Sequence, residues 1–177
     1  AFDSVPRSAL LFKLSQMGIR GNVFSVIRSM YEKSTCQLRL NNKLTRKISI
    51  GKGTEQGHTL SPELFKSYLQ DASPRLNFGN VPSLGDTLLS HRLWADDLVL
   101  VVLDLDTAQK RFNTFVDYCK ELGLEINESK TNLVIFNKRS LKNNQEFVYM
   151  GNDPIKTVES YTYLGLALHM NGSMSTA

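Results

Sequence analysis

Residues 93–100, LWADDLVL, place two adjacent carboxylates, Asp96 and Asp97, inside an apolar run. Apolar residues on both sides of a polar pair are typical of two short strands that meet at a turn. We therefore expect strands within residues 90–103, with the break at Asp96-Asp97. An ionised carboxylate in apolar surroundings is costly unless a hydrogen-bond donor, a cation or water compensates it. The pair either lies in a solvated turn or meets a cation, and spacing alone favours the solvated turn.

Composition indicates one ordinary folded domain and excludes fibrous and disordered chains: 41% of the 177 residues are hydrophobic and 21% are charged. The 21 basic and 17 acidic residues give a net charge of +4, which suits a polyanionic partner without identifying one. The longest apolar run, residues 98–103, is too short to cross a bilayer, and no signal peptide is evident. We expect no membrane contact and an intracellular protein of the nucleus or cytoplasm, cut from a longer chain.

Apolar spacings of three and four residues predict helices over residues 6–17 and 22–31, and a longer one that Asp106 caps and Gly123 ends. Ser61-Pro62-Glu63, a cap followed by a first-turn proline and a first-turn acid, predicts a helix over residues 61–69. Alternation predicts a hairpin over residues 36–50 with its turn at Asn41-Asn42, and strands over residues 132–136, 146–149 and 160–168. Cys36 and Cys119 fall at apolar positions of these elements, so we expect both to be buried free thiols. The three histidines show no zinc spacing.

Five blocks in a fixed order resemble the reverse transcriptases of non-LTR (LINE-type) retrotransposons. They are AFDSVP (1–6), GTEQGHTLSP (53–62), LWADDLVL (93–100), GLEINESKT (123–131) and YLG (163–165). The resemblance implies an α+β fold, the palm of a right-hand polymerase, with a small antiparallel sheet that bears the carboxylates and helices behind one face. Residues 1–170 would be a partial reverse transcriptase domain without fingers and thumb, and residues 171–177 a tail.

The same resemblance implies two-metal nucleotidyl transfer, in which two Mg²⁺ ions, or Mn²⁺ in their place, act on an RNA template, a DNA primer and deoxynucleotides. Asp96 would be the main metal ligand, with Asp97 in support. The family pattern D-x-x-x-A-F-D puts a further metal-binding aspartate four residues before Ala1. We therefore expect the 177 residues alone to be inactive or nearly so, and Asp3 to cap the first helix instead.

Three residues match the nucleotide-binding positions of the family. Phe2 matches the aromatic that packs under the incoming sugar, and the alternative is an ordinary core phenylalanine. Gln56 and Gly57 match a loop beside the nucleotide and template, and the alternative is a glycine-rich turn before a helix.

Two further blocks match positions for the leaving group and the primer. Lys130 matches a lysine that protonates or neutralises the leaving pyrophosphate, with a solvated surface lysine as the alternative. Tyr163-Leu164-Gly165 matches the hairpin that grips the primer, although aromatic residues in strands are more often core. Basic residues also cluster at Lys43, Arg46, Lys47 and Lys52 and again at Lys138, Arg139 and Lys142, where they could follow phosphates.

Two other interpretations remain open at this point. The chain could be a non-catalytic nucleic-acid-binding remnant of a decayed element. It could also be the palm of a group II intron-type reverse transcriptase, since the palm motifs are shared.

Overall fold

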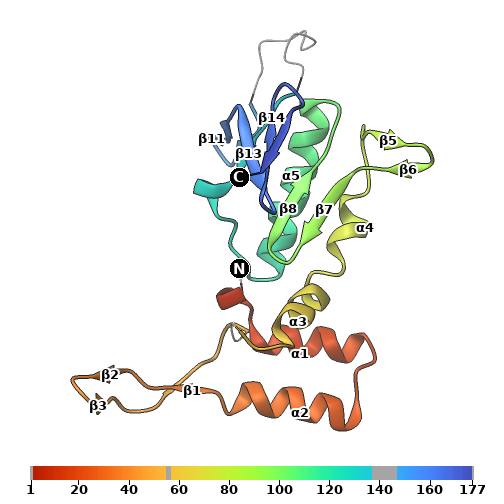
Figure 1. Ribbon diagram of the computed structural model, residues 1–177. Coiled ribbons are helices and arrows are strands. Elements are labelled where there is room, and N and C mark those ends of the chain that lie inside the picture. Colours follow the sequence, from red (N-terminus) through yellow and green to blue (C-terminus); the bar gives the residue numbers. More distant parts are fainter. Residues whose placement is uncertain (1, 55–56, 137–146, 177) are drawn as a thin grey trace. The chain divides into compact units, whose positions relative to one another are not determined.

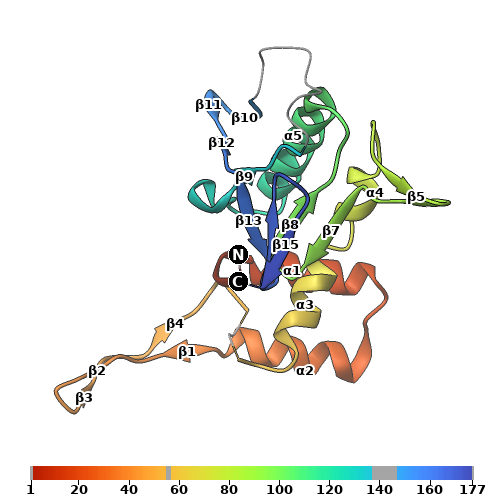
Figure 2. The ribbon, with the colours of Figure 1, turned by 45° about the horizontal axis from the view of Figure 1, so that its top comes forward.

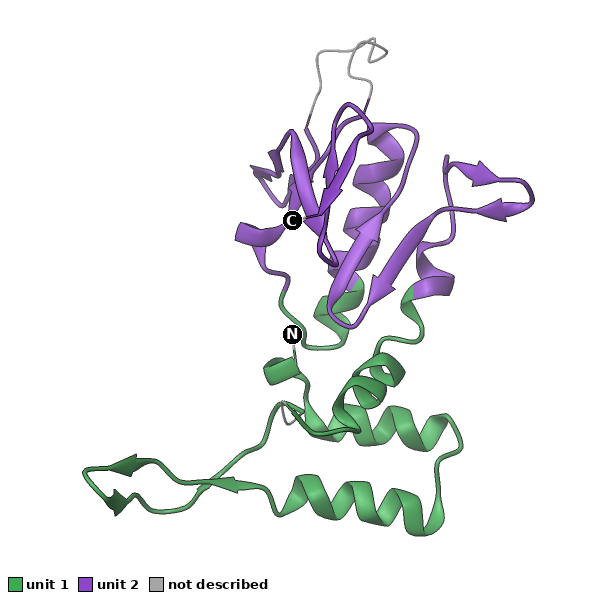
Figure 3. Cartoon of the chain, in the orientation of Figure 1, with its two compact units in different colours: residues 1–72, 118–125 green, residues 73–117, 126–177 purple. Residues whose placement is uncertain are grey.

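The computed structural model describes residues 2–54, 57–136 and 147–176, and the chain divides into two compact units. Unit 1 contains residues 1–72 and 118–125, and unit 2 contains residues 73–117 and 126–177 (Figure 3). The long helix α5 (Leu105–Glu121) contributes residues to both units. Helices combined with small sheets confirm the expected α+β class.

Unit 1 is built on three helices (Figure 1): α1 (Arg7–Gln16), α2 (Gly21–Glu32) and α3 (Ser61–Tyr68). The predicted helices 6–17, 22–31 and 61–69 are thus confirmed within one or two residues at each end. Their apolar positions form the core of the unit, because residues three and four apart share one helix face. The buried apolar residues of this unit include Val5, Leu10, Leu14, Ile27, Leu64, Phe65 and Tyr68.

The first residues of the chain pair with Gly53 and Thr54. The amides of Gly53 and Thr54 donate to the carbonyl oxygens of Val5 and Phe2 over 2.8 and 3.0 Å. Gly53 has φ +87°, and a Cβ there would lie 3.0 Å from the Asp3 carbonyl oxygen, so glycine is required. The prediction that Asp3 caps the first helix is wrong. Asp3 lies in the 3₁₀ turn η1 (Phe2–Ser4), and the N-cap position of α1 is Pro6.

Between α2 and α3 the chain forms a two-stranded ribbon. Strand β1 (Thr35–Cys36) pairs with β4 (Ile48–Ser49), and β2 (Arg39–Leu40) pairs with β3 (Lys43–Leu44). The predicted hairpin turn is confirmed: Asn41 and Asn42 have φ of 46° and 62°, as a two-residue type I′ turn requires. Cys36 is exposed, so the prediction that it is buried is wrong. Alternation places it on one face of the ribbon, but every strand residue of this ribbon is exposed.

The described residues of unit 2 form several hairpins and one parallel strand pair. Three of the hairpins are β5 (Ser83–Leu84) with β6 (Thr87–Leu88), β7 (His91–Trp94) with β8 (Asp97–Leu100), and β13 (Ser160–Tyr163) with β14 (Leu166–His169). Strand β15 (Met174–Thr176), inside the segment expected to be a tail, pairs with β14. Strand β9 (Asn132–Leu133) runs parallel to β12 (Lys156–Thr157), and β10 (Tyr149–Met150) pairs with β11 (Asp153–Pro154). The expected single antiparallel sheet is therefore divided into several small ones.

The unit 2 part of α5 packs its apolar face against these strands. Ala108 and Phe112 are buried with Val148 and Ile155, and partly buried side chains surround them: Leu100, Val102, Leu105, Val116, Leu133 and Met150. Leu100 of β8 packs against this core, which explains why the residues of β8 that follow Asp97 are apolar. Helix α4 (Ala72–Leu76) had no counterpart in the sequence analysis.

The predicted cap of α5 is wrong by two residues. The Asp104 carboxylate, not that of Asp106, accepts from the Thr107 amide over 2.7 Å and from the Thr107 hydroxyl over 3.0 Å. Asp106 instead forms an exposed ion pair with Lys110 over 2.7 Å. The predicted stop at Gly123 is confirmed: it has φ +67°, and the Leu124 amide donates to the Cys119 carbonyl over 2.8 Å, as in a Schellman motif.

Candidate active site

The turn of the β7–β8 hairpin consists of Ala95 and Asp96. Trp94 pairs with Asp97 in the ladder, which leaves two residues for the turn. The break was expected at Asp96-Asp97 and lies one residue earlier, so Asp97 is the first residue of β8. Ala95 has φ +51°, a left-handed conformation that costs an L-residue with a Cβ about 1–2 kcal/mol. The tight ladder on both sides imposes this conformation at the turn.

Both carboxylates of the hairpin are exposed, whereas Leu93 and Leu98 beside them are half-buried. Within the described residues, neither the Asp96 nor the Asp97 carboxylate makes a hydrogen bond or an ion pair. Water therefore compensates the two charges within an apolar run, and two adjacent anionic groups with unused oxygen lone pairs project from one turn.

A second hairpin of unit 2 lies near the first, as both views show (Figures 1 and 2). Its two-residue turn is Leu164-Gly165, with φ of 50° and 82° between the paired residues Tyr163 and Leu166. Tyr163 is half-buried. Burial raises the pKa of its hydroxyl, the charge of Asp97 raises that pKa further, and Arg92 opposes both. The structure thus brings the predicted primer residue Tyr163 within electrostatic reach of the predicted metal ligand Asp97.

Lys130 lies in a separate 3₁₀ turn of unit 2, η2 (Glu128–Lys130). The side chain of Asn127 caps this turn by accepting from the Lys130 amide over 3.2 Å. Lys130 is exposed, and among the described residues no hydrogen bond or ion pair joins it to Asp96 or Asp97. Its backbone position is fixed locally, and its side chain is free to reach a ligand.

The predicted nucleotide-binding residues belong to unit 1. Phe2 is half-buried and stacks on Phe65, with ring centroids 4.4 Å apart and an interplanar angle of 21°. This stacking matches the core interpretation of Phe2 and leaves part of the ring exposed. Gly57 is exposed with φ +85°, a backbone conformation that requires glycine, and Gln56 lies outside the described residues.

Comparison with known families decides the class of this site. The profile of the reverse transcriptase (RNA-dependent DNA polymerase) family matches residues 1–168. The chain belongs to the reverse transcriptase family. The family resemblance that the five sequence blocks carry is therefore confirmed.

Curated relatives place this reverse transcriptase with the non-LTR elements. One Pol polyprotein of the type-1 retrotransposable element R2 from Popillia japonica is 28% identical over an alignment of 182 positions that covers 97% of this chain and 30% of that protein. Another from the same organism is 29% identical over 74% of this chain and 19% of its own length. An uncharacterized 149 kDa protein of transposon TX1 from Xenopus laevis is 27% identical over 74% of this chain and 10% of that protein. The chain spans less than a third of the length of these relatives.

The oxygen ligands of the carboxylate pair suit a hard divalent cation, but the pair supplies only two side chains as ligands. Carboxylate oxygens are the ligands that Mg²⁺ prefers, and Asp96 and Asp97 have theirs unused. In residues 2–54, 57–136 and 147–176, however, no group of three or more His, Cys, Asp or Glu side chains could hold a metal. The same residues contain no helix that is both long and apolar enough to span a membrane.

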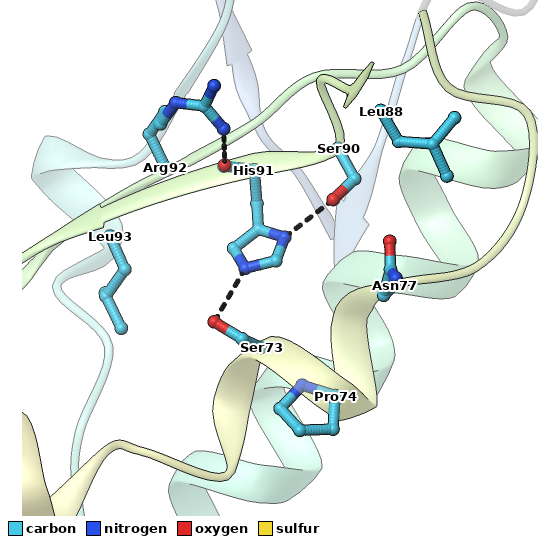
Figure 4. Close-up of a pocket in the computed structure, with 8 residues that line it drawn as sticks. All are labelled: Ser73, Pro74, Asn77, Leu88, Ser90, His91, Arg92 and Leu93. Atoms are coloured by element: carbon cyan, nitrogen blue, oxygen red, sulfur yellow. Dashed lines mark hydrogen bonds between the residues drawn. The ribbon is translucent and has the colours of Figure 1, made fainter. Parts of the chain in front are cut away.

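The sequence analysis missed a polar cluster at the start of β7. The two ring nitrogens of His91 lie 2.8 Å from the Ser90 hydroxyl and 2.9 Å from the Ser73 hydroxyl, in an open pocket of unit 2 (Figure 4). Burial lowers the pKa of His91, and the charges of Arg111 and Arg92 lower it further, so the imidazole is neutral near pH 7. No periodic pattern marks His91, because its partners come from different elements.

Arg111 of α5 is fully buried, which the sequence also did not indicate. Its Nη1 donates to the Val101 carbonyl over 3.0 Å, while Nε and Nη2 have no partner among the described residues. Burial lowers its pKa. One signal was present: Arg111 is three residues after Ala108 and directly before Phe112, on the apolar side of the helix.

Proposed function

We propose that this chain holds the nucleotidyl-transfer part of an R2-type reverse transcriptase, which adds deoxynucleotides to a DNA primer opposite an RNA template. The observation that supports it best is the β7–β8 turn, where Asp96 and Asp97 present unpaired carboxylates inside a family match of 168 residues. An exposed carboxylate pair supplies the kind of oxygen ligand that a metal-dependent transfer site uses.

Asp96 would be the main ligand and Asp97 the supporting ligand for Mg²⁺, with Mn²⁺ as a substitute. When bound, the metal ions activate the primer 3′-hydroxyl and neutralise the triphosphate charge. The β13–β14 turn, Tyr163-Leu164-Gly165, would contact the primer near these ligands, because the charge of Asp97 raises the pKa of the Tyr163 hydroxyl.

The remaining predicted residues would act on the nucleotide. Lys130, exposed on its capped turn, would neutralise or protonate the leaving pyrophosphate. Phe2 would pack under the incoming sugar with the part of its ring that Phe65 leaves open, and Gln56 and Gly57 would lie beside the nucleotide.

The 177 residues alone would form an incomplete palm that needs fingers, thumb and a third acidic ligand from the parent chain. Support comes from the number of ligands: two carboxylates are fewer than a two-metal site uses, and no described side chain completes the set. We therefore propose that this chain by itself binds Mg²⁺ weakly and is inactive or nearly so.

Primer extension on an RNA template tests the assignment with a matched control. The parent chain, extended upstream through the aspartate that the family pattern places before Ala1, should extend the primer with Mg²⁺, and Asp96→Asn should reduce extension at least 100-fold. Asp86→Asn is the control, because Asp86 also follows a left-handed residue, Gly85, in the two-residue turn of the β5–β6 hairpin.

The outcomes separate the two parts of the proposal. A folded extended chain without activity, or Asp96→Asn with normal activity, would contradict the polymerase assignment. Processive synthesis by residues 1–177 alone would contradict only the claim that their metal site is incomplete.

A further inference from the structure

We propose that the ribbon of residues 33–54 is a docking surface for duplex DNA, separate from the candidate active site. We call this segment the basic ribbon. It lies beyond the end of α2 in unit 1 (Figure 1). The proposal concerns binding without chemistry, so it does not depend on the polymerase assignment.

The basic ribbon carries all of the chain's excess positive charge. Six of the 21 basic residues and none of the 17 acidic residues lie between Lys33 and Thr54, so the rest of the chain has 15 basic and 17 acidic residues. The six are Lys33, Arg39, Lys43, Arg46, Lys47 and Lys52. All six are exposed, and within the described residues none of them forms an ion pair with an acidic residue. A concentrated, unpaired positive charge on one element suits a phosphate backbone.

The ladder register distributes these cations over both faces of the basic ribbon. Arg39 pairs with Leu44, and Leu40 pairs with Lys43, so each cross-strand pair combines one cation with one leucine. Directly opposed residues share a face and successive residues alternate, which puts Arg39 and Lys43 on opposite faces. A ribbon inserted between two phosphate strands would meet both with positive charge.

The exposed apolar residues of the basic ribbon fit the same partner. Leu38, Leu40 and Leu44 are 59%, 63% and 56% exposed. Because each face mixes leucine with a cation, the ribbon has no continuous apolar face of the kind that an obligate protein interface needs. Single apolar contacts between cations are instead suited to base edges, such as the thymine methyl group.

The base of the basic ribbon is held in place by Arg7. This buried side chain donates to the carbonyl oxygens of Tyr31, Ile50 and Gly53 over 2.8, 2.6 and 2.9 Å. The Ile50 amide also donates to the Ser34 carbonyl over 3.1 Å. Both strands are therefore tied to the helical part of unit 1, which reduces the entropy lost when the ribbon binds.

Ribbon geometry favours duplex DNA over duplex RNA. The major groove of B-form DNA is about 12 Å wide and admits a two-stranded ribbon. The major groove of A-form RNA is too narrow for side chains to read. The inferred mode is therefore insertion of the ribbon tip, around Asn41-Asn42, into a major groove.

Fluorescence anisotropy with a labelled 20-base-pair DNA duplex, in EDTA, tests this inference without involving metal or polymerisation. The variant Arg39→Gln/Lys43→Gln/Arg46→Gln/Lys47→Gln should bind at least 30-fold more weakly in 50 mM salt. Its plot of log affinity against log salt should have a slope smaller in magnitude by about 3.6, since each of the four lost phosphate contacts removes about 0.9.

A control with the same change in charge is Arg28→Gln/Lys66→Gln/Lys110→Gln/Lys156→Gln, at four exposed positions outside the basic ribbon. It should lose less than 3-fold, and both variants should show only a small change in thermal midpoint because no buried group changes and the lost ion pairs are exposed. Equal losses in the two variants would overturn the inference in favour of net charge alone. So would unchanged DNA affinity of the ribbon variant, or a larger loss of RNA affinity than of duplex-DNA affinity in that variant.

Discussion

The Asp97 carboxylate raises the pKa of the Tyr163 hydroxyl, although the two residues belong to different hairpins of unit 2. Burial of Tyr163 is the larger cause of the rise, and the positive charge of Arg92 acts in the opposite direction. Because the charge of Asp97 changes the pKa of this hydroxyl, a cation bound at Asp97 should change the same pKa. This pair therefore links the two predicted halves of the site, the metal ligands and the primer hairpin.

Replacing Asp97 by asparagine should lower the pKa of Tyr163, because one cause of its rise is removed. The pKa should stay above the ordinary tyrosine value, since burial remains. Ultraviolet difference titration measures it, with Tyr163→Phe identifying the signal among the six tyrosines. Asp86→Asn is the control and should leave the titration unchanged; an equal effect of both variants would mean that Asp97 does not act on Tyr163.

The same titration should detect a divalent cation, with Ca²⁺ as the probe because Mg²⁺ precipitates as its hydroxide at the alkaline pH at which tyrosine titrates. A cation held by Asp96 and Asp97 offsets the negative charge near Tyr163, so saturating Ca²⁺ should lower the Tyr163 pKa in the wild-type chain. The double variant Asp96→Asn/Asp97→Asn should show no such shift. A wild-type titration that saturating Ca²⁺ does not move would argue against metal binding at this turn.

Arg7→Met should lower the free energy of unfolding by about 3 kcal/mol, because three backbone carbonyls lose a charged donor at a buried position. The loss includes the contact of the guanidinium with the Tyr31 ring, 4.9 Å from its centroid. Urea unfolding followed by circular dichroism measures the change. Arg28→Met removes only an exposed pair with Glu32 and should cost less than about 0.5 kcal/mol, so similar losses would contradict the role of Arg7.

Asp104→Ala should destabilise α5 by about 1 kcal/mol near pH 7, since the cap bonds to Thr107 are lost. The Thr107 amide is the main cause that lowers the Asp104 pKa in the folded chain. The stabilisation from these cap bonds is therefore fully present above the unfolded pKa of Asp104 and is lost as the pH falls through its lower folded pKa. Unfolding free energies of the two proteins should converge once the pH lies below the folded pKa. Asp106→Ala, at the exposed pair with Lys110, should show a much smaller effect; a pH-independent gap for Asp104→Ala would contradict the mechanism.

The two cysteines should react very differently with iodoacetamide at pH 8. Cys36 is exposed, whereas burial of Cys119 raises its pKa to about 11 and keeps it a protonated thiol. Mass spectrometry should show one modified cysteine in the native chain, two in guanidinium chloride, and none in native Cys36→Ser. Labelling of Cys119 at the rate of Cys36 in the native chain would contradict its burial.

Local patterns in the sequence predicted the elements and part of the site. Helices α1, α2 and α5 follow from apolar spacing, and α3 follows from the helix-start residues Ser61-Pro62-Glu63. The Asn41-Asn42 turn and the stop at Gly123 follow from backbone preferences. Residue types and their order also indicated the reverse transcriptase family, which the profile match confirms. These features depend on neighbours within a few residues, so a linear sequence contains them.

Other features depend on which segments meet, and only the tertiary structure decided them. Alternation placed Cys36 on a strand face, but in the described part of the chain that side chain is exposed. Arg7 is buried because carbonyl oxygens from two separate segments, the end of α2 and residues 50–53, converge on its guanidinium. The coupling of Tyr163 to Asp97 arises because two hairpins approach each other. Burial and electrostatic interaction are set by distances in space, and residues far apart along the chain acquire those distances only when it folds.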